Sequence, residues 1–177
     1  MATSITRMVT FEDVNKLPEP EGASYYELHH GEVVQLTRPA LNHIFVQKRL
    51  QNLLDSASAK GSAFVEVGLR LLNEFEYRIA DVAWSPQEHW GRMDPAGQFM
   101  GAPELVVEVL SPSNTASEML DKKQLCLENG ATEFWAVDMV RRQVEVSTRE
   151  GRVHTYRAGQ QIPLFFGGSI AVDAIFA

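Results

Sequence analysis

Cysteine and long hydrophobic runs are both scarce in this sequence. Cys126 is the single cysteine, which excludes an internal disulfide and a cysteine-based zinc site and is typical of a reducing compartment. No apolar run approaches the roughly 18 residues that a membrane-spanning helix needs. The N-terminal stretch MATSITRMVTFEDV lacks the apolar segment of a signal peptide. We therefore expect a cytoplasmic protein with no membrane partner.

Positive charge is also in short supply. The chain has 16 Lys and Arg against 23 Asp and Glu, a net charge of −7, and a pI of about 5.2. Strong non-specific DNA binding depends on a basic face, so this balance counts against a nucleic-acid substrate without excluding one. A local basic strip or divalent metal ions can offset a negative total. Candidates for such a strip are Lys48-Arg49, Lys122-Lys123 and Arg141-Arg142, although each pair alone is typical of solvated surface charge.

The remaining composition is that of a globular protein with a core, since 45% of the 177 residues are hydrophobic and 22% are charged. That length suits one domain spanning 1–177. Apolar periodicity and capping residues predict a short helix after Thr10 and longer helices over 41–58 and 115–129. Strands are predicted over 25–28, 32–37, 63–69, 77–84, 105–110, 134–138, 144–148 and 153–156. The polar composition of segment 85–102 predicts a long exposed loop. The order predicts an α/β (α+β) fold with a mixed central sheet flanked by helices.

Two acidic residues occupy positions where burial is expected. Asp81 lies within the apolar segment 77–84, and Glu108 interrupts the continuous apolar run 105–110. A buried carboxylate must be paired or must bind a metal ion. Because the two strands are sequential, adjacent pairing would bring the two carboxylates together. Such a pair suits Mg²⁺ or Mn²⁺, which can polarise a phosphoryl oxygen and activate a water molecule.

For either acid alone, a structural salt bridge is an equally good interpretation. Arg70 and Arg78 are the obvious partners. Two buried acids on neighbouring strands, followed by a helix that carries lysines, favour a site over two separate salt bridges.

Several segments resemble the Uma-two family, restriction-endonuclease-like proteins of the PD-(D/E)xK nuclease superfamily. The segments are YYELHHGEVVQL, RIADVAWSP, PELVVEVLSPSN, DKKQLCLENGATEFWAVD and QVEVSTREGRVHTY, and the resemblance runs from about Thr10 to the final IAVDAIF. It implies a nuclease fold, a divalent metal cofactor and a DNA substrate. The order and spacing of the motifs are more specific than any one of them.

The resemblance also implies particular site residues. The superfamily's Pro-Asp pair corresponds to Ala80-Asp81, so the metal-binding aspartate is present and the proline is not. The second acid corresponds to Glu108. The superfamily's lysine normally follows that acid by two residues, where this chain has Leu110. In the Uma-two family a helix lysine about eight residues before a glycine replaces it, which is Lys122 before Gly130.

Lys123 is the competing candidate for the site lysine. On a helical wheel it falls within the stripe of Met119 and Cys126, whereas Lys122 lies at the stripe's edge. Helix geometry therefore favours Lys123 and family spacing favours Lys122, which we adopt. Either lysine could position or deprotonate the attacking water and offset phosphate charge.

Three further residues have a possible role. Glu27 matches a glutamate typical of the family and could complete the metal shell, although a surface acid on a hairpin strand is nearly as good an interpretation. His43 opens the helix over 41–58, and a lone histidine there is more often a cap or a polar contact than a base. Trp90, in the polar loop, is either a loop anchor or a base-stacking platform.

The leading hypothesis is a Mg²⁺- or Mn²⁺-dependent endonuclease that hydrolyses DNA phosphodiester bonds. Its metal ligands would be Asp81, Glu108 and the Val109 carbonyl, with Lys122 and Glu27 completing the catalytic set. The alternative is a catalytically weak or inactive nuclease-fold module that binds or regulates, and a hydrolase of small phosphate esters is a third. We also expect a homodimer, because sheet edges are exposed and the segment 162–166 is apolar enough to pack on a neighbour.

Overall fold

The computed structural model describes residues 8–22, 24–71, 73–112 and 114–177. The stretch that argues against a signal peptide lies partly outside these residues. The elements follow in the order α1 (Phe11–Val14), β1 (Ser24–His29), β2 (Glu32–Thr37), α2 (Leu41–Ala57), β3 (Gly61–Arg70), β4 (Tyr77–Pro86), the 3₁₀ helix η1 (Gln87–Gly91), β5 (Phe99–Met100), β6 (Leu105–Val109), α3 (Ala116–Glu128), β7 (Glu133–Asp138), β8 (Gln143–Thr148), β9 (Val153–Arg157), β10 (Gln161–Pro163), β11 (Ser169–Ala171) and α4 (Val172–Ile175).

α1, α2, α3 and the longer strands agree with the sequence prediction, whereas α4 is not predicted. α1 and α3 each begin at a threonine, Thr10 and Thr115, whose hydroxyl accepts a hydrogen bond from the third helical N–H. The prediction of a long exposed loop over 85–102 is wrong, because η1 and β5 form within it and Trp90 and Phe99 are buried. Trp90 is the anchor of this segment: it is buried and makes edge contacts with the rings of Phe64 and Phe99.

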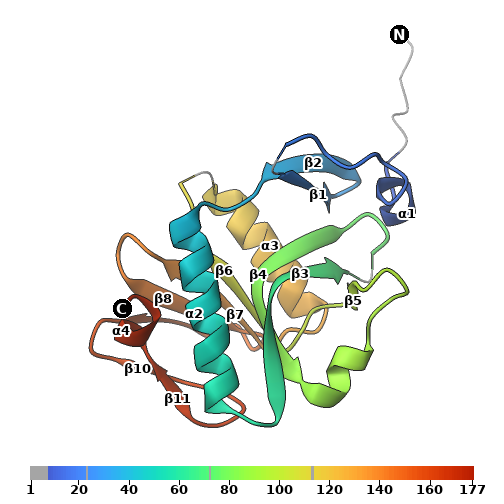
Figure 1. The fold of residues 1–177 in the computed structure, drawn as a ribbon. Coiled ribbons are helices and arrows are strands. Elements are labelled where there is room, and N and C mark those ends of the chain that lie inside the picture. Colours follow the sequence, from blue (N-terminus) through green and yellow to red (C-terminus); the bar gives the residue numbers. More distant parts are fainter. Residues whose placement is uncertain (1–7, 23, 72, 113) are drawn as a thin grey trace.

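One mixed sheet organises the fold (Figure 1). Its strands lie in the order β2-β1-β4-β6-β7-β8-β9, and β3 pairs with β4 outside this path. β6 and β7 are parallel, so the connection between them must cross a face of the sheet, and α3 is that crossover. The mixed central sheet with flanking helices is therefore confirmed.

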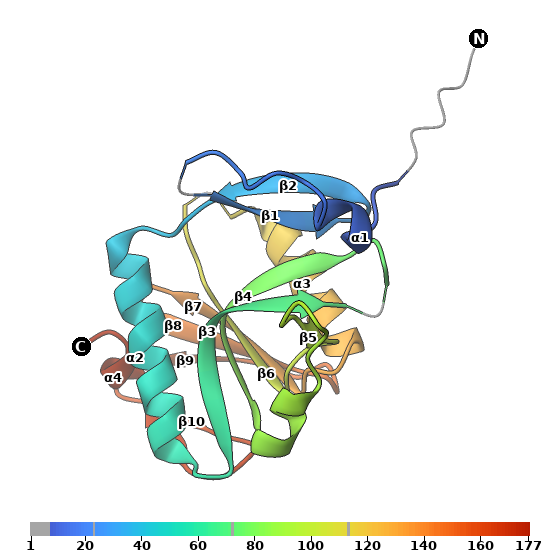
Figure 2. The ribbon, with the colours of Figure 1, turned by 45° about the vertical axis from the view of Figure 1, so that its right-hand side comes forward.

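α2 and α3 cover opposite faces of the sheet (Figures 1 and 2). Alternate residues of β6 point to the two helices, as strand geometry requires. On the α2 side the core contains Leu50, Leu54, Val82, Trp84, Leu105, Val107 and Trp135. On the α3 side it contains Ala80, Ala83, Val106, Cys126 and Phe134.

Two strands share one edge of β4. β3 follows the other edge along the length of β4. On the shared edge, β1 pairs with β4 at Leu28↔Tyr77, and β6 pairs with it from Val82↔Val107 to Trp84↔Leu105. Residues 78–81 lie between these two contacts, and no strand pairing is described for them on this edge. Their backbone groups therefore need other partners.

The apolar C-terminal segment packs mainly on its own chain. Ile162 and Leu164 are buried in the α2-side core, and Phe166 stacks on Trp84. The argument that segment 162–166 packs on a neighbour is therefore wrong for these residues. Across the described ranges, the helices are all too short or too polar to span a bilayer.

Candidate active site

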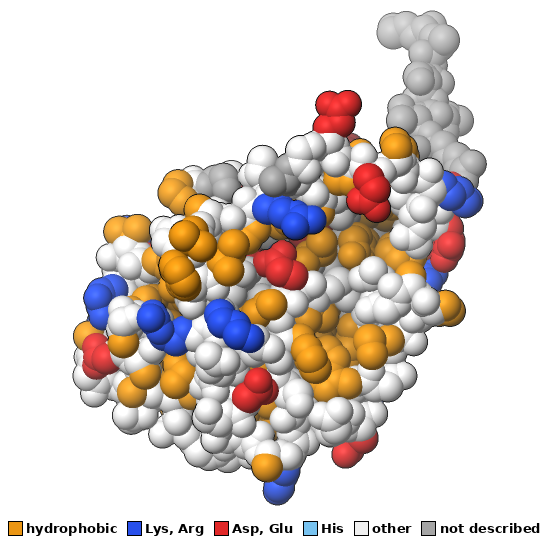
Figure 3. All heavy atoms as spheres, in the orientation of Figure 1, with side chains coloured by type: hydrophobic (Ala, Val, Ile, Leu, Met, Phe, Trp, Pro, Cys, Tyr) orange, Lys and Arg blue, Asp and Glu red, His pale blue; other side chains and the backbone are white. Residues whose placement is uncertain are grey.

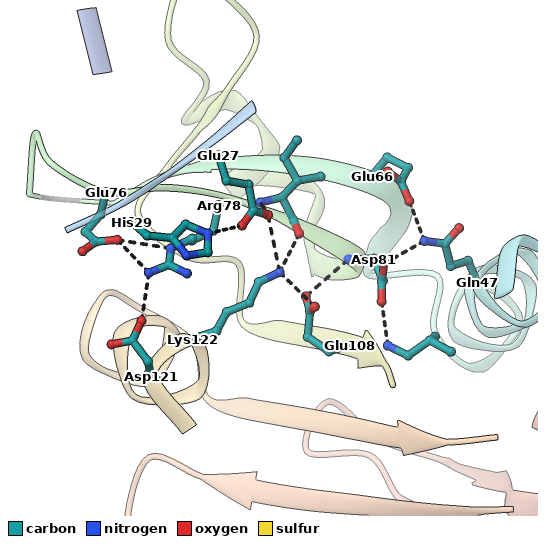
Figure 4. A network of polar contacts seen from close by, with 12 residues as sticks. Glu27, His29, Gln47, Glu66, Glu76, Arg78, Asp81, Glu108, Asp121 and Lys122 are labelled. Atoms are coloured by element: carbon teal, nitrogen blue, oxygen red, sulfur yellow. Dashed lines mark hydrogen bonds and ion pairs between the residues drawn. The ribbon is translucent and has the colours of Figure 1, made fainter. Parts of the chain in front are cut away.

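Side chains bind the free backbone groups on the shared edge of β4 (Figure 4). The N–H of Ile79 donates to Oε1 of Glu27 at 2.8 Å, and its carbonyl accepts from Nζ of Lys122 at 2.7 Å. The N–H of Asp81 lies 3.4 Å from Oε1 of Glu108. Glu27 comes from β1, Glu108 from β6 and Lys122 from α3, so the gap between β1 and β6 brings together residues distant in the sequence.

Asp81 and Glu108 lie side by side, as adjacent pairing of their strands predicts. Oδ2 of Asp81 accepts from the N–H of Val109 at 2.6 Å. The N–H and carbonyl of a residue in a strand point to the same edge, so the Val109 carbonyl also faces β4. The Asp81 side chain is 15% exposed and that of Glu108 is 9% exposed. Asp81 is therefore the more exposed of the two acids.

Lys122, and not Lys123, faces the two acids. Its ammonium group lies 2.8 Å from Oε2 of Glu108, and the side chain is 10% exposed. Lys123 instead lies 3.4 Å from Glu145. The helical-wheel argument for Lys123 is wrong because the buried stripe of α3 runs through Met119, Lys122 and Cys126, spaced i, i+3 and i+7.

Glu27 is buried, so its interpretation as a surface acid is wrong. Its residue exposure is 2%, and Oε2 lies 2.6 Å from Nε2 of His29. Oε1, which accepts from Ile79, also lies 3.8 Å from the Lys122 ammonium. In Figure 4 the Lys122 ammonium lies between Glu27 on one side and Glu108 on the other. Glu27 therefore contacts the lysine directly.

α2 contributes two residues that contact Asp81 from the other face of the sheet. The amide nitrogen of Gln47 donates to Oδ1 of Asp81 at 2.9 Å and to Oε1 of Glu66 at 2.5 Å. Nε2 of His43 lies 3.0 Å from the same Oδ1, without the geometry of a hydrogen bond. His43 is buried, and within the described part of the chain this nitrogen has no hydrogen-bond partner.

Sequence reasoning missed Gln47 and Glu66. One signal was available for Gln47. Gln47 and His43 lie at i−3 and i−7 from Leu50, which places two polar side chains on the buried face of α2. Glu66 gave no such signal, because an exposed glutamate in an alternating strand is ordinary.

Burial and the neighbouring charges together shift the pKa values in this cluster. Burial raises the pKa of Glu108 to about 8; the neighbouring Asp81 adds to the rise and Lys122 opposes it. Burial and the charge of Asp81 also raise the pKa of Glu66 above its ordinary value. Burial alone would lower the pKa of Lys122, but Glu108, Glu27 and Asp81 raise it.

The pKa of Glu27 moves in the opposite direction from that of Glu108. Burial alone would raise it, but the Lys122 charge, His29 and the Ile79 N–H together lower it below its ordinary value. Glu27 therefore carries the negative charge that faces Lys122.

The salt-bridge alternative for Asp81 and Glu108 is wrong for both proposed arginines. Arg70 pairs with Glu12 and Asp94. Arg78 pairs with Glu76 and Asp121 and is itself 1% exposed.

The donor chemistry fits a divalent cation. Oxygen atoms of Asp81, Glu108 and the Val109 carbonyl are the ligand type that Mg²⁺ and Mn²⁺ prefer. The unpartnered nitrogen of His43 faces the same aspartate. Within the described ranges, no group of three or more His, Cys, Asp or Glu side chains is arranged to hold a metal ion unaided. A cation here would therefore depend on the backbone carbonyl and on water or substrate for its remaining ligands.

A cavity in the described part of the chain lies elsewhere. It has a volume of about 530 Å³ and lies between α3 and strands β7 and β8, where Met119, Lys123, Phe134 and Glu145 contribute to its wall. Because it contains neither Asp81 nor Glu108, it is separate from the acidic cluster.

Comparison with known proteins identifies similar sequences and folds. The model of the family Uma2, described as "Putative restriction endonuclease", matches residues 11–172. A crystal structure described as "a putative nuclease belonging to DUF820", from Anabaena variabilis, is similar over 95% of this chain and 97% of that chain, with 21% identity and a TM-score of 0.80. No curated protein matches the sequence. The structural match shows that the fold is nuclease-like.

Proposed function

The chain belongs to the Uma2 family of restriction-endonuclease-type proteins, and we propose that it is a metal-dependent endonuclease that hydrolyses DNA. The observation that carries the proposal is the convergence of Asp81, Glu108 and Lys122 at the unpaired stretch of β4. Two carboxylates and a lysine around one accessible point supply both a cation site and a positive group for a phosphodiester. The family and the nuclease-like fold support the proposed function.

Each residue has a separate role in the proposal. Asp81, Glu108 and the Val109 carbonyl would hold Mg²⁺ or Mn²⁺. When bound, such an ion polarises a phosphoryl oxygen and lowers the pKa of a water molecule. Lys122 would donate to the attacking water or to a phosphate oxygen, since its ammonium already donates to oxygen atoms at this point. Glu27 is buried and lies 3.8 Å from the Lys122 ammonium, so we assign it to holding Lys122.

Cleavage assays on purified protein test the proposal. We expect supercoiled plasmid or a duplex oligonucleotide to be cut with Mg²⁺ or Mn²⁺ and to stay intact with EDTA. Asp81→Asn, Glu108→Gln and Lys122→Met should each abolish cutting. Lys123→Met is the matched control and should cut normally, because Lys123 pairs with Glu145 instead. Cutting that survives in Asp81→Asn protein purified in the same way would refute the proposal.

A second candidate, a nuclease-fold module without activity, is favoured by the charge distribution. The net charge is −7, and on the face that carries α2 and β3 the basic side chains are scattered among hydrophobic and acidic ones (Figure 3). Phosphate binding favours a continuous basic strip. Calorimetric binding of Mn²⁺ without any cleavage of DNA would select this candidate.

We retain a homodimer as part of the proposal, because two copies would supply one site for each strand of a duplex. Sedimentation at micromolar concentration that shows only a 19.8 kDa species would contradict it.

A further inference from the structure

Glu66 has a backbone conformation that is unusual for its residue type. Its φ is 54°, in the left-handed region that costs free energy for any residue with a Cβ atom. The pairing of β3 with β4 is described at Val65↔Val82 and again at Val67↔Ala80, but not at the step between them. That step would place Glu66 opposite Asp81. The irregularity therefore lies directly beside the proposed metal ligand.

The side chain of Glu66 reaches Asp81 through one amide group. The buried Gln47 donates from a single nitrogen to both carboxylates, at 2.5 Å to Glu66 and 2.9 Å to Asp81 (Figure 4). An amide nitrogen has two N–H donors, and ionised carboxylates only accept, so this orientation of the amide satisfies both bonds and the flipped one satisfies neither. Glu66 thereby adds a second acceptor that holds the nitrogen end of the Gln47 amide toward Asp81.

With this contact, both oxygens of Asp81 have a donor from the protein. Oδ1 accepts from Gln47, and Oδ2 accepts from the N–H of Val109. Two donors on opposite oxygens fix the plane of a carboxylate. Partners of this kind orient a metal ligand, and their loss typically weakens metal binding about 10- to 100-fold.

We propose that Glu66 is a positioning residue for Asp81, acting through Gln47, and that the strained backbone at Glu66 is retained for this purpose. The inference rests on the proposed function, because it assumes that Asp81 binds a cation. Strained conformations persist where surrounding structure holds them, and they concentrate at functional sites. A substitution of Glu66 that removes both its carboxylate and its backbone strain should therefore leave the fold at least as stable and should lower the affinity for the metal ion.

The test measures thermal unfolding and calorimetric Mn²⁺ binding on the same variants. Glu66→Gly removes both the carboxylate and the strain, since glycine adopts positive φ freely. We expect a melting temperature equal to or above wild type and a Mn²⁺ dissociation constant at least about tenfold weaker. Glu66→Gln keeps an acceptor oxygen for Gln47 and should retain wild-type Mn²⁺ affinity within about threefold. If Glu66 acted only through its negative charge, this variant would lose affinity as Glu66→Gly does.

Arg142→Gly is the matched control for strain. Arg142 also has a positive φ, 49°, but lies in the turn between β7 and β8. Its replacement should raise the melting temperature and leave Mn²⁺ affinity unchanged. Glu66→Gly combined with Gln47→Leu should bind Mn²⁺ no more weakly than Gln47→Leu alone, because the effect of Glu66 passes through Gln47.

The outcomes separate this inference from the proposed function. Wild-type protein that binds no Mn²⁺ overturns both. Wild-type binding that Glu66→Gly leaves unchanged overturns the inference alone. A fall in both melting temperature and affinity for Glu66→Gly also overturns it, because that result indicates a general structural role.

Discussion

The carboxylate of Asp81 and the backbone N–H of Val109 are joined by a 2.6 Å hydrogen bond across the gap between β4 and β6. This bond directs the Asp81 side chain toward β6, where Glu108 is the preceding residue. β4 and β6 pair regularly from Val82↔Val107 to Trp84↔Leu105, so the interruption of their pairing is local. A carboxylate that replaces a ladder hydrogen bond is held by the backbone itself, which suits a residue that must keep one orientation.

The first prediction concerns metal affinity. Asp81→Asn and Glu108→Gln should each weaken Mn²⁺ binding by at least about tenfold, because each removes a negatively charged oxygen ligand. Isothermal titration calorimetry measures the change. Glu145→Gln removes an acid that pairs with Lys123 and should leave the affinity as it is. Equal affinities for all three variants would contradict the assignment of the ligands.

The second prediction separates the two lysines by stability. Lys122→Met leaves the buried Glu108 without its cationic partner and should lower the free energy of unfolding by about 3 kcal/mol at pH 8. Lys123→Met breaks a more exposed pair and should cost less than about 1 kcal/mol. Urea unfolding measures both. Adding Glu108→Gln to Lys122→Met should recover part of the loss, and a double variant less stable than Lys122→Met would count against the pairing.

The third prediction concerns the buried arginine. Arg78 is 1% exposed and pairs with Glu76, which directly precedes β4, and with Asp121, next to Lys122 on α3. Arg78→Leu should lower the free energy of unfolding by about 3–5 kcal/mol, because the buried Glu76 loses its guanidinium partner and, among the described residues, keeps only its contacts with His30. Arg141→Leu is the control: that side chain is 72% exposed, and its loss should cost less than about 1 kcal/mol. Similar unfolding midpoints for the two variants would refute the prediction.

The fourth prediction concerns pH. Glu133 is 9% exposed and accepts a hydrogen bond from the indole N–H of Trp135, and burial, with a contribution from Glu150, raises its pKa above the ordinary value. The folded state therefore holds this proton more tightly than the unfolded state. Stability is highest below the unfolded pKa and falls as pH rises through the raised folded value.

Glu133→Gln keeps an acceptor for Trp135 and removes the ionisation. The variant should gain more in melting temperature relative to wild type at pH 7 than at pH 4. Thermal unfolding of both proteins at both pH values checks this expectation. An equal difference at the two pH values would show that ionisation of Glu133 has no effect on stability.

Periodicity and capping predicted α1, α2, α3 and the strands of five or more residues, but not η1. β5, β10 and β11 have two or three residues each, too few for an alternating pattern to differ from a loop. Their backbone follows from tertiary packing, as when Ile162 of β10 enters the α2-side core. Local sequence does not encode such contacts.

The sequence likewise predicts some residues of the candidate site and not others. Asp81 and Glu108 could be identified because acids stand out in apolar strands. The choice of Lys122 over Lys123 could not be made from the helical wheel, because a lysine inside the buried stripe contradicts the rule that defines the stripe. The left-handed backbone of Glu66 has no sequence signal, since glutamate rarely adopts it.

The single cysteine offers a direct measurement on the helix that carries Lys122. Cys126 is fully buried one turn further along α3, and burial raises the pKa of its thiol to about 12. A thiol reagent can modify it only when that helix detaches from the sheet. The rate of alkylation therefore reports how often α3 detaches from the sheet. A slower rate with bound Mn²⁺ would show that metal binding makes this detachment rarer.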